Sequence, residues 1–269
     1  MNTDSCFKIG KTHIVCQDYA INTKDHIALS DGCSSSPNSD IGARLLCLTN
    51  EKHHGITADA KYFLPTVKEI TKQLQISEEC LNATLFTSDC ISYNNKAVFN
   101  TMTWGDGVIV FINDNNYVIM SIEYTNNLPL YPIYFCNPEC QSILKSLTCN
   151  IKIYTSTNKK EQCFIEIDKN HKLCKESLRD LKIYPTINKS IQIFTDNSNY
   201  NKIVLFSDGI HSFMQNNKLL NYYDIIPELI NFKNTTGEFV KRRVNRFMKN
   251  CAKNGIEHLD DFSMAAISI

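Results

Sequence analysis

Short acidic motifs stand at the ends of apolar, strand-like runs, and they constrain the fold of this chain more than any other feature. Asp31 closes the run HIALSD, and Asp208 follows the run IVLFS. The last apolar run, FSMAAISI, begins directly after Asp260-Asp261. Two further acids belong to the set, Asp18 in the segment CQDY and Asp106 in the segment WGDG. Carboxylates at strand ends can converge in space, and oxygen ligands suit magnesium and manganese. The motifs therefore predict a hard-cation site, and a metal-dependent hydrolase is the leading interpretation.

The apolar pattern predicts many strands and few helices. Alternating apolar and β-branched residues mark strands, whereas apolar residues spaced by three and four mark helices. Strands are expected near 6–10, 13–22, 26–31, 84–92, 96–104, 107–113, 116–124, 131–135, 151–155, 163–167, 191–195, 202–207 and 262–269. Helices are expected at about 40–52, 58–75, 137–147, 222–231 and 235–252. Ser39 or Asp40 is the expected N-cap of the first helix.

The order of these elements favours one fold class. Strands come in runs and helices in blocks, which argues against a parallel sheet built from alternating strands and helices. We expect an α+β fold with two stacked, mainly antiparallel β-sheets flanked by helices. No internal repeat or flexible linker interrupts the chain, so residues 1–269 are expected to form a single domain. The segment 126–200 is the least readable part.

The charge balance bears on the partners of the protein. The 28 basic and 28 acidic residues cancel, so the sequence offers no electrostatic case for nucleic acid or membrane as a partner. The one basic run, Lys241-Arg242-Arg243 with Arg246 and Lys249, is interpreted as the solvated face of a helix. No apolar stretch is long enough for secretion or for a membrane span, so a cytoplasmic location is expected.

Twelve cysteines are many, but their spacing is irregular. No paired, closely spaced Cys and His residues stand where a structural zinc site needs them. We therefore interpret the cysteines as reduced, small, mostly buried side chains. A zinc-binding module is the least favoured function.

Each acidic motif has an ordinary structural explanation when it is taken alone. Asp-Gly is a common turn dipeptide, which accounts for Asp31-Gly32 and Asp208-Gly209. Asp106-Gly107 stands between two expected strands, as the turn of a hairpin would. A coincidence of all the motifs, in this order and context, is much less expected than any single one.

The order of the motifs resembles the metal-dependent protein phosphatases, the 2C-type serine/threonine phosphatase family, in a divergent bacterial-type form. That family has an early Glu-Asp, a strand ending in Asp-Gly before a helix, a Gly-Asp turn, a strand ending in Ser-Asp-Gly, and Asp-Asn before a terminal strand. The matching segments here span residues 13 to 269, with little contribution from 126–200. They are VCQDYA, IALSDGCSSSPNSDIGARLL, NATLFTSDC, TWGDGVIVF, IVLFSDGIHSF and LDDFSMAAISI.

The resemblance implies a two-metal centre that holds manganese or magnesium. By position, the ligands would be Asp18, Asp31, Asp208 and Asp260, together with the backbone carbonyl of Gly32. Asp106 would match the acid that helps to hold a third, weaker metal. Two cations that share a bridging water lower its pKa and offset the charge on the phosphoryl group during in-line attack, so no nucleophilic Ser or Cys is needed.

The chain departs from the family pattern at several positions. His13 stands where the family carries an Arg that grips the substrate phosphate, and a His can donate to phosphate but lacks the bidentate fork of Arg. Gln17 replaces the usual Glu and removes a charge near the cations. Cys33 follows Asp31-Gly32 in place of a glycine or histidine and is not expected to be a proton donor. His211-Ser212 stands where Trp-Asp is common, which weakens the case for a third metal.

Arg44, on the helix after Asp31, is a second candidate for binding the substrate phosphate. From this helix it can reach back towards the site in place of the missing Arg. The alternative is an ion pair with Asp40, one helical turn away.

The function inferred from these residues is hydrolysis of phosphoserine and phosphothreonine in a phosphorylated protein substrate, with a protein kinase as a possible counterpart. A non-catalytic relative that binds a phosphoprotein or a regulator is the alternative. The retained ligand positions argue against it, and the lost Arg and Glu argue mildly for it. A carboxylate-based metal nuclease is disfavoured because no basic stripe could hold a polyanion.

Overall fold

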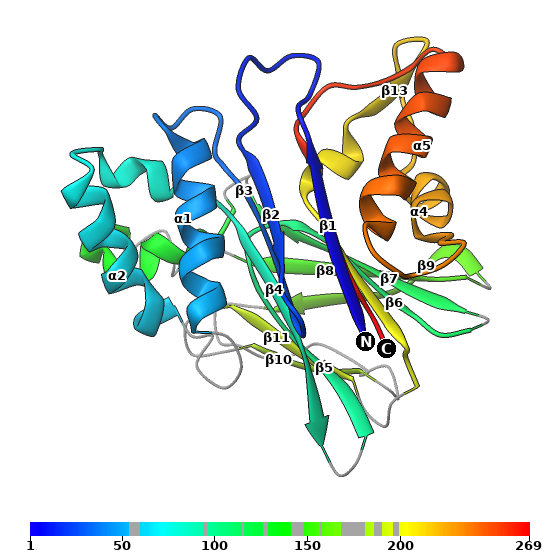
Figure 1. Ribbon diagram of the computed structural model, residues 1–269, viewed down its shortest axis with the longest axis horizontal. Coiled ribbons are helices and arrows are strands. Elements are labelled where there is room, and N and C mark those ends of the chain that lie inside the picture. The colour runs from blue at the N-terminus through cyan, green and yellow to red at the C-terminus, as the bar shows by residue number, and fades with distance from the viewer. Residues whose placement is uncertain are drawn as a thin grey trace.

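Two antiparallel β-sheets lie face to face in the computed structural model of this chain (Figure 1). The structure describes residues 1–53, 60–93, 96–114, 116–125, 129–140, 148–156, 158–167, 181–185, 190–195 and 199–269. The seven-stranded sheet has the order β1 (Asn2–Lys8), β16 (Phe262–Ser268), β12 (Lys202–Phe206), β6 (Gly107–Ile112), β7 (Tyr117–Tyr124), β8 (Cys149–Thr155) and β9 (Asn158–Ile167). The six-stranded sheet has the order β10 (Leu181–Pro185), β11 (Ile191–Thr195), β5 (Lys96–Trp104), β4 (Leu85–Tyr93), β3 (His26–Asp31) and β2 (Asp18–Asn22).

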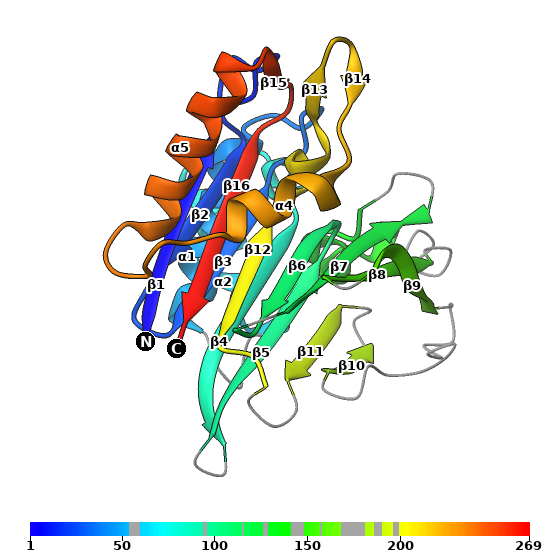
Figure 2. The same ribbon diagram turned by 90° about the vertical axis from the view of Figure 1, so that its right-hand side faces the viewer.

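Helices cover the outer face of each sheet, so the layers run α-β-β-α, as Figures 1 and 2 show. The helices α1 (Ser39–Lys52) and α2 (Ala60–Gln73) pack on the six-stranded sheet. On the seven-stranded sheet lie α4 (Tyr222–Ile230) and α5 (Phe239–Lys253). The expected α+β class with two stacked, mainly antiparallel sheets flanked by helices is therefore confirmed. No helix in the described part of the chain combines the length and the apolar character needed to cross a bilayer.

Both faces of the central strands are buried, which explains their nearly continuous apolar sequences. In β16, Ala265 and Ile267 face the space between the sheets, whereas Met264 and Ala266 face α5. In β6, Phe111 likewise faces the other sheet. Because successive side chains of a strand point to opposite faces, each such strand joins two apolar layers. The strand ends are thereby fixed in position, and the acidic motifs stand at those ends.

The acidic strand ends meet at one edge of the sandwich because the strands are antiparallel neighbours. Asp18 at the start of β2 is paired with Asp31 at the end of β3. The end of β12, at Phe206, pairs with Val108 near the start of β6 and with Met264 near the start of β16. These two sets of ends belong to different sheets, and the hydrogen bond from the Gln17 amide, just before β2, to Asp261, just before β16, joins them at one edge.

The turn at Asp106 is not the hairpin that its sequence predicts. The preceding strand, β5, belongs to the six-stranded sheet, and the following strand, β6, belongs to the seven-stranded sheet. Gly105 has a φ of 96°, a left-handed value that favours glycine. The turn thus carries the chain from one sheet to the other and places Asp106 between them.

Several expected boundaries are wrong. The strand expected at 13–22 begins at Asp18, because residues 9–17 form a loop, and the strand expected at 6–10 is β1 at 2–8. The strand expected at 131–135 is a 3-10 helix, η3 (Pro132–Cys136), with Pro in its first turn. The cap of α1 is Asn38, which has a φ of 56° and makes no side-chain cap.

Other expectations are met only in part. Of the helix expected at 137–147, the structure describes only the 3-10 turn η4 (Pro138–Cys140), and 141–147 lies outside the described residues. The strand β10 and the small sheet of β14 (Lys218–Leu219), β13 (Phe213–Gln215) and β15 (Ile256–His258) were not expected. The single domain expected over 1–269 stays a prediction.

Candidate metal centre

Asp18 is a buried carboxylate, 1% exposed, and among the described residues neither of its oxygens has a hydrogen-bond partner at ordinary geometry. The hydroxyls of Ser207 and Ser263 lie near enough to lower its pKa, but they compensate for only part of the lost hydration. Its neighbour across the β2–β3 pair is Asp31, a second acid. A buried carboxylate normally has a donor or a cation beside it, because loss of hydration is costly for a charge. A cation beside Asp18 would therefore stabilise its buried charge.

Asp208 enters the same site from the 3-10 helix η5 (Asp208–His211). Its Oδ1 is buried and has no partner. The preceding residue is fixed to β16, because the Ser207 amide donates to the Ser263 carbonyl at 3.1 Å and the Ser263 amide donates to Ser207 Oγ at 2.9 Å. Gly209 is required here, because a Cβ on it would lie 1.7 Å from the carbonyl oxygen of Asp261. The η5 turn is thus clamped against the chain that carries the last acidic pair.

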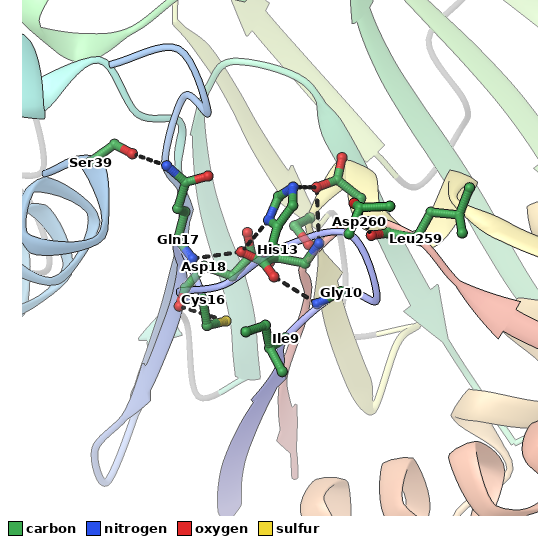
Figure 3. Close-up of polar contacts among 12 residues, drawn as sticks. Ile9, Gly10, His13, Cys16, Gln17, Asp18, Ser39, Leu259 and Asp260 are labelled. Atoms are coloured by element: carbon green, nitrogen blue, oxygen red, sulfur yellow. Dashed lines mark hydrogen bonds and ion pairs between the residues drawn. The ribbon is translucent and has the colours of Figure 1, made fainter. Parts of the chain in front are cut away.

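Asp260 and Asp261 have different environments, and Figure 3 shows His13 beside Asp260. The side chain of Asp260 is 48% exposed and that of Asp261 is 1% exposed. His13 Nδ1 lies 2.9 Å from Asp261 Oδ2, and His13 Nε2 lies 3.3 Å from Asp260 Oδ1. Both ring nitrogens thus face carboxylates, and this geometry lets His13 position Asp260. Phosphate binding by His13 stays a prediction.

Asp261 holds the loop 9–17 in place. The backbone amide of Gly10 donates to its Oδ1 at 2.7 Å, and the backbone amide of Gln17 donates to its Oδ2 at 2.6 Å. The side chain of Gln17 in turn donates from Nε2 to Ser39 Oγ at 2.7 Å, at the start of α1 (Figure 3). The loop that leads into Asp18 is therefore tied both to the last strand and to α1.

Gly32 lies in a tight space between β3 and α1. A Cβ on Gly32 would lie 2.8 Å from the carbonyl oxygen of Ser39, which is closer than real contacts allow. Its amide donates to the Gln17 carbonyl at 3.2 Å. Its own carbonyl, expected as a metal ligand, stays a prediction.

The carboxylates act on one another through space. Burial raises the pKa of Asp18 to about 7, against hydrogen bonds from Ser207 and Asp31 that lower it, and the charge of Asp208 adds to the rise. Loss of hydration, followed by the charges of Asp208 and Asp18, raises the pKa of Asp31 well above its ordinary range. Burial and then the charge of Asp208 raise the pKa of Asp106 to about 7, and the same two causes raise the pKa of Asp260. Asp208 therefore stands at the centre of the group.

The donor set fits a hard divalent cation. Among the described residues, no three Asp, Glu, His or Cys side chains already stand around one point as the ligands of a metal do. The chemistry nevertheless matches, since the orphaned atoms are carboxylate oxygens of Asp18 and Asp208. Crowded carboxylates with raised pKa values lose their protons readily once a cation offsets their charge. All five expected acids, Asp18, Asp31, Asp106, Asp208 and Asp260, belong to this group.

A cavity of about 350 Å³ opens beside the acids. Asp106, Asp208 and Asp260 line one part of it, and Glu123 and His211 line another. The sequence analysis missed Glu123, although an acid inside the apolar strand YVIMSIEY is a usable signal. Lys152 Nζ donates to Glu123 Oε2 at 2.7 Å, so this acid is paired. Burial lowers the pKa of His211, which favours a neutral ring in the wall of the cavity.

Arg44 lies on the exposed side of α1. Its guanidinium carbon is 5.6 Å from the centre of the Tyr19 ring, a cation–π distance. Among the described ion pairs, none joins Arg44 to Asp40. Tyr19 directly follows Asp18 in β2, and phosphate binding by Arg44 stays a prediction.

Known proteins share this fold. The family model for protein phosphatase 2C matches residues 9–249. A search of curated proteins found no match. A bacterial serine phosphatase aligns with a TM-score of 0.56 at 10% identity, covering 100% of this chain and 98% of that one. The serine/threonine phosphatase PstP/Ppp of Mycobacterium tuberculosis has a TM-score of 0.53 at 10% identity, with 100% and 99% covered. Stp1 of Staphylococcus aureus has a TM-score of 0.52 at 12% identity, with 100% and 95% covered. At such identities, the likeness to solved structures shows the fold alone.

Proposed function

Because the chain belongs to the protein phosphatase 2C family, we propose that it is a metal-dependent phosphoprotein phosphatase that hydrolyses phosphoserine and phosphothreonine. One observation carries the proposal: Asp18 is 1% exposed, and neither of its oxygens has a hydrogen-bond partner at ordinary geometry among the described residues. A bound cation would compensate for the cost of burying this carboxylate. The solved structures of this fold include serine/threonine phosphatases, which agrees with the proposed substrate class.

Two manganese or magnesium ions would be held by Asp18, Asp31, Asp208 and Asp260 together with the Gly32 carbonyl, and a third, weaker ion by Asp106. When bound, such ions lower the pKa of a water and offset negative charge on a phosphoryl oxygen. The proposed ligands are oxygen atoms throughout, as hard cations require. They arise on strand ends and on a clamped turn, so the backbone positions that carry them are fixed by the fold, and the side chains would close around the ions.

The residues around the acids orient them and shape the approach of the substrate. Asp261 fixes the loop 9–17 through the amides of Gly10 and Gln17, which sets the position of Asp18. Partial burial lowers the pKa of His13, but the hydrogen bond to Asp261 and the charges of Asp261, Asp260 and Asp18 outweigh it, and the net pKa is raised. A protonated His13 holds Asp260 in place and puts positive charge beside the site where a phosphate would lie.

The cavity beside the acids is large enough for a side chain but too small for a folded domain. Its volume of about 350 Å³ suits a phosphorylated side chain and a few flanking atoms. A phosphorylated protein is therefore the proposed substrate, and a protein kinase that makes such a substrate is the proposed counterpart. Arg44, on the exposed side of α1, would contact the phosphate or the residues around it.

The test is hydrolysis of para-nitrophenyl phosphate and of a phosphothreonine peptide, with and without manganese. We expect turnover only with the metal, and we expect Asp208→Asn to abolish it. Asp114→Asn is the matched control, because Asp114 is an exposed acid in the turn between β6 and β7 that accepts a hydrogen bond from Asn201 at 2.6 Å. Full activity in the Asp208→Asn protein would contradict the proposed metal centre. Metal binding without turnover on either substrate would support the alternative, a phosphatase-fold protein that binds a phosphoprotein.

A further inference from the structure

A recess lined with basic side chains lies at the start of α5, away from the candidate metal centre. It has a volume of about 140 Å³. Three arginines of α5 and one lysine of the preceding loop line it, together with two asparagines of that loop and two phenylalanines. The lining residues are Asn231, Phe232, Lys233, Asn234, Phe239, Arg242, Arg243 and Arg246.

The positive charge of this recess is only partly offset by the residues around it, since Glu228 acts on Arg243 through space. Among the described residues, no carboxylate lies within ion-pair distance of Arg242, Arg243 or Arg246. In the part of the chain that the structure describes, Arg242 donates to two neutral oxygens, Asn234 Oδ1 at 2.9 Å and the Thr236 carbonyl at 2.7 Å. The Nε atom of Arg243 is buried and has no hydrogen-bond partner among these same residues. A chain with no net charge thus gathers unpaired donors at one small recess.

The recess is formed by side chains and not by the free amides of a helix terminus. The first amides of α5 are already taken, because Val240 N and Lys241 N donate to Asp4 Oδ2 at 2.6 and 3.0 Å. Asp4 comes from β1 and is 7% exposed. An anion in the recess would therefore bind the guanidinium groups and the lysine.

The walls of the recess are held in place without a ligand. The rings of Phe232 and Phe239 meet edge to face, with centroids 5.0 Å apart and an angle of 85°. The two hydrogen bonds from Arg242 tie the loop to the helix. Little side-chain freedom remains to be lost when an anion binds, which favours affinity.

The recess lies at the opposite end of the sandwich from the acidic group. Strand β16 starts directly after Asp261 and ends at Ser268, whose Oγ lies 3.2 Å from Oγ1 of Thr235 in the loop beside the recess. Seven residues of strand span about 20 Å. Figures 1 and 2 show the start of α5 beside the two chain termini, at the end of the sheet that the acidic strand ends do not reach. An anion bound here would not touch the metal centre.

We propose that this recess binds the phosphate of a phosphorylated side chain on a protein ligand, at a second site separate from the metal centre. A volume of about 140 Å³ has room for a phosphate, a group of five non-hydrogen atoms. Arginine donors match phosphate geometry in pairs. The aromatic wall gives a peptide chain an apolar surface to contact. A nucleic acid would need a basic stripe and a membrane a flat basic face, and a small recess with three arginines and one lysine supplies neither.

The test measures binding by calorimetry in a protein that carries Asp208→Asn, with a chelator present and at low salt, so that the metal centre takes no part. The probes are a phosphoserine tetrapeptide, its unphosphorylated form and inorganic phosphate. We expect one peptide bound per chain, more tightly than inorganic phosphate, and no binding of the unphosphorylated form. Arg243→Gln and Arg246→Gln should each weaken peptide binding by about tenfold or more, since each removes charge-assisted hydrogen bonds.

Matched variants separate the recess from general attraction. Lys249→Gln removes the same charge from the same helix outside the recess and should change the affinity by less than about twofold. Arg243→Lys keeps the charge and loses the planar donor fork, so its affinity should fall between those of the original protein and Arg243→Gln. Arg246 is exposed, so its replacement leaves the fold intact.

Three outcomes would overturn the proposal. Equal loss of affinity in Lys249→Gln and Arg246→Gln would mean diffuse attraction to a basic helix. Equal affinity for inorganic phosphate and the peptide would mean that the recess recognises phosphate alone and not a phosphorylated protein. Arginine-dependent binding to vesicles of phosphatidylcholine and phosphatidylserine in equal parts, without peptide binding, would assign the recess to a lipid surface. None of these outcomes bears on the proposed phosphatase activity, which is measured with the metal centre intact.

Discussion

Asp18 lies directly opposite Asp31 in the antiparallel pair of β2 and β3. Like charges at opposite positions of a sheet repel, and here one of the two is buried. The fold keeps them together because β2 and β3 are fixed on both faces by apolar layers, with Ala20, Ile27 and Leu29 in the layer between the sheets and Ala28 in the layer under the helices. The protein thus holds a destabilising pair in its core, as expected where binding energy from a ligand compensates.

Replacement of Asp18 by Asn should stabilise the metal-free protein. The amide keeps the shape of the side chain and removes the buried charge, so we expect a gain of about 1 kcal/mol in the free energy of unfolding in a chelator, at about pH 8. Urea denaturation measures this gain, and Asp114→Asn should show none. With manganese present the order should reverse, because the variant lacks a ligand. If Asp18→Asn were less stable than the original protein in the chelator, the proposed repulsion between Asp18 and Asp31 would be wrong.

The stability of the metal-free protein should fall as the pH rises. In the folded state the pKa of Asp18 and that of Asp106 are both raised from 3.8 to about 7. The folded state therefore binds more protons than the unfolded state between those two values, and the stability contribution is complete below about pH 4 and is lost as the pH rises through about 7. The melting temperature in a chelator should drop across this window by a few degrees. The drop in melting temperature should be smaller in Asp106→Asn. An unchanged drop in that variant would contradict the raised pKa of Asp106.

Replacement of Gly209 by Ala should destabilise the protein strongly. The new Cβ would lie 1.7 Å from the Asp261 carbonyl oxygen and 2.8 Å from its carbon, and both are backbone atoms that cannot turn aside. We expect a loss of about 3 kcal/mol and a loss of metal-dependent turnover, because η5 carries Asp208. Gly255→Ala is the control. It sits at a φ of 65° with no atom within 4 Å, so only the backbone strain of about 1 kcal/mol applies. Equal losses in the two variants would rule out the clash.

Removal of the Asp261 carboxylate should release the loop 9–17. Asp261→Ala leaves the amides of Gly10 and Gln17 without an acceptor, at a cost of about 3 kcal/mol. Asp261→Asn keeps one oxygen and should cost about half as much. Tryptic cleavage after Lys11 measures the release directly and should be faster in the Ala variant than in the Asn variant. Unchanged cleavage in both would mean that the loop is held by other contacts.

The fold class followed from the sequence because the strands of this protein are easy to recognise. Those in the middle of the sheets, such as β6 and β12, are buried on both faces and read as continuous apolar runs. The strands that escaped recognition are short or lie at sheet edges. β14 has two residues, both exposed, and so carries no apolar signal. The apolar run at 131–135 was misread because five residues are too few to separate a strand from a 3-10 helix.

The loop 9–17 shows a limit of a different kind. Val15 and Cys16 have strand character, yet this segment is bent away from the sheet by Asp261, a residue more than two hundred positions further along the chain. No local pattern can report an acceptor so distant. Likewise, the turn at Asp106 reads as a hairpin, because a local pattern does not tell which sheet each flanking strand joins.

The sequence by itself determined which residues are acidic and that they stand at strand ends, because apolar runs and their interruptions are local properties. Only the tertiary structure decided that Asp18 faces Asp31, that Asp208 lies at the centre of the group, and that His13 turns both nitrogens to Asp260 and Asp261. It also decided that Arg242, Arg243 and Arg246, a solvated helix face by pattern, line a recess. These relationships depend on strand order and on packing between layers, which are set by contacts between residues far apart in the chain.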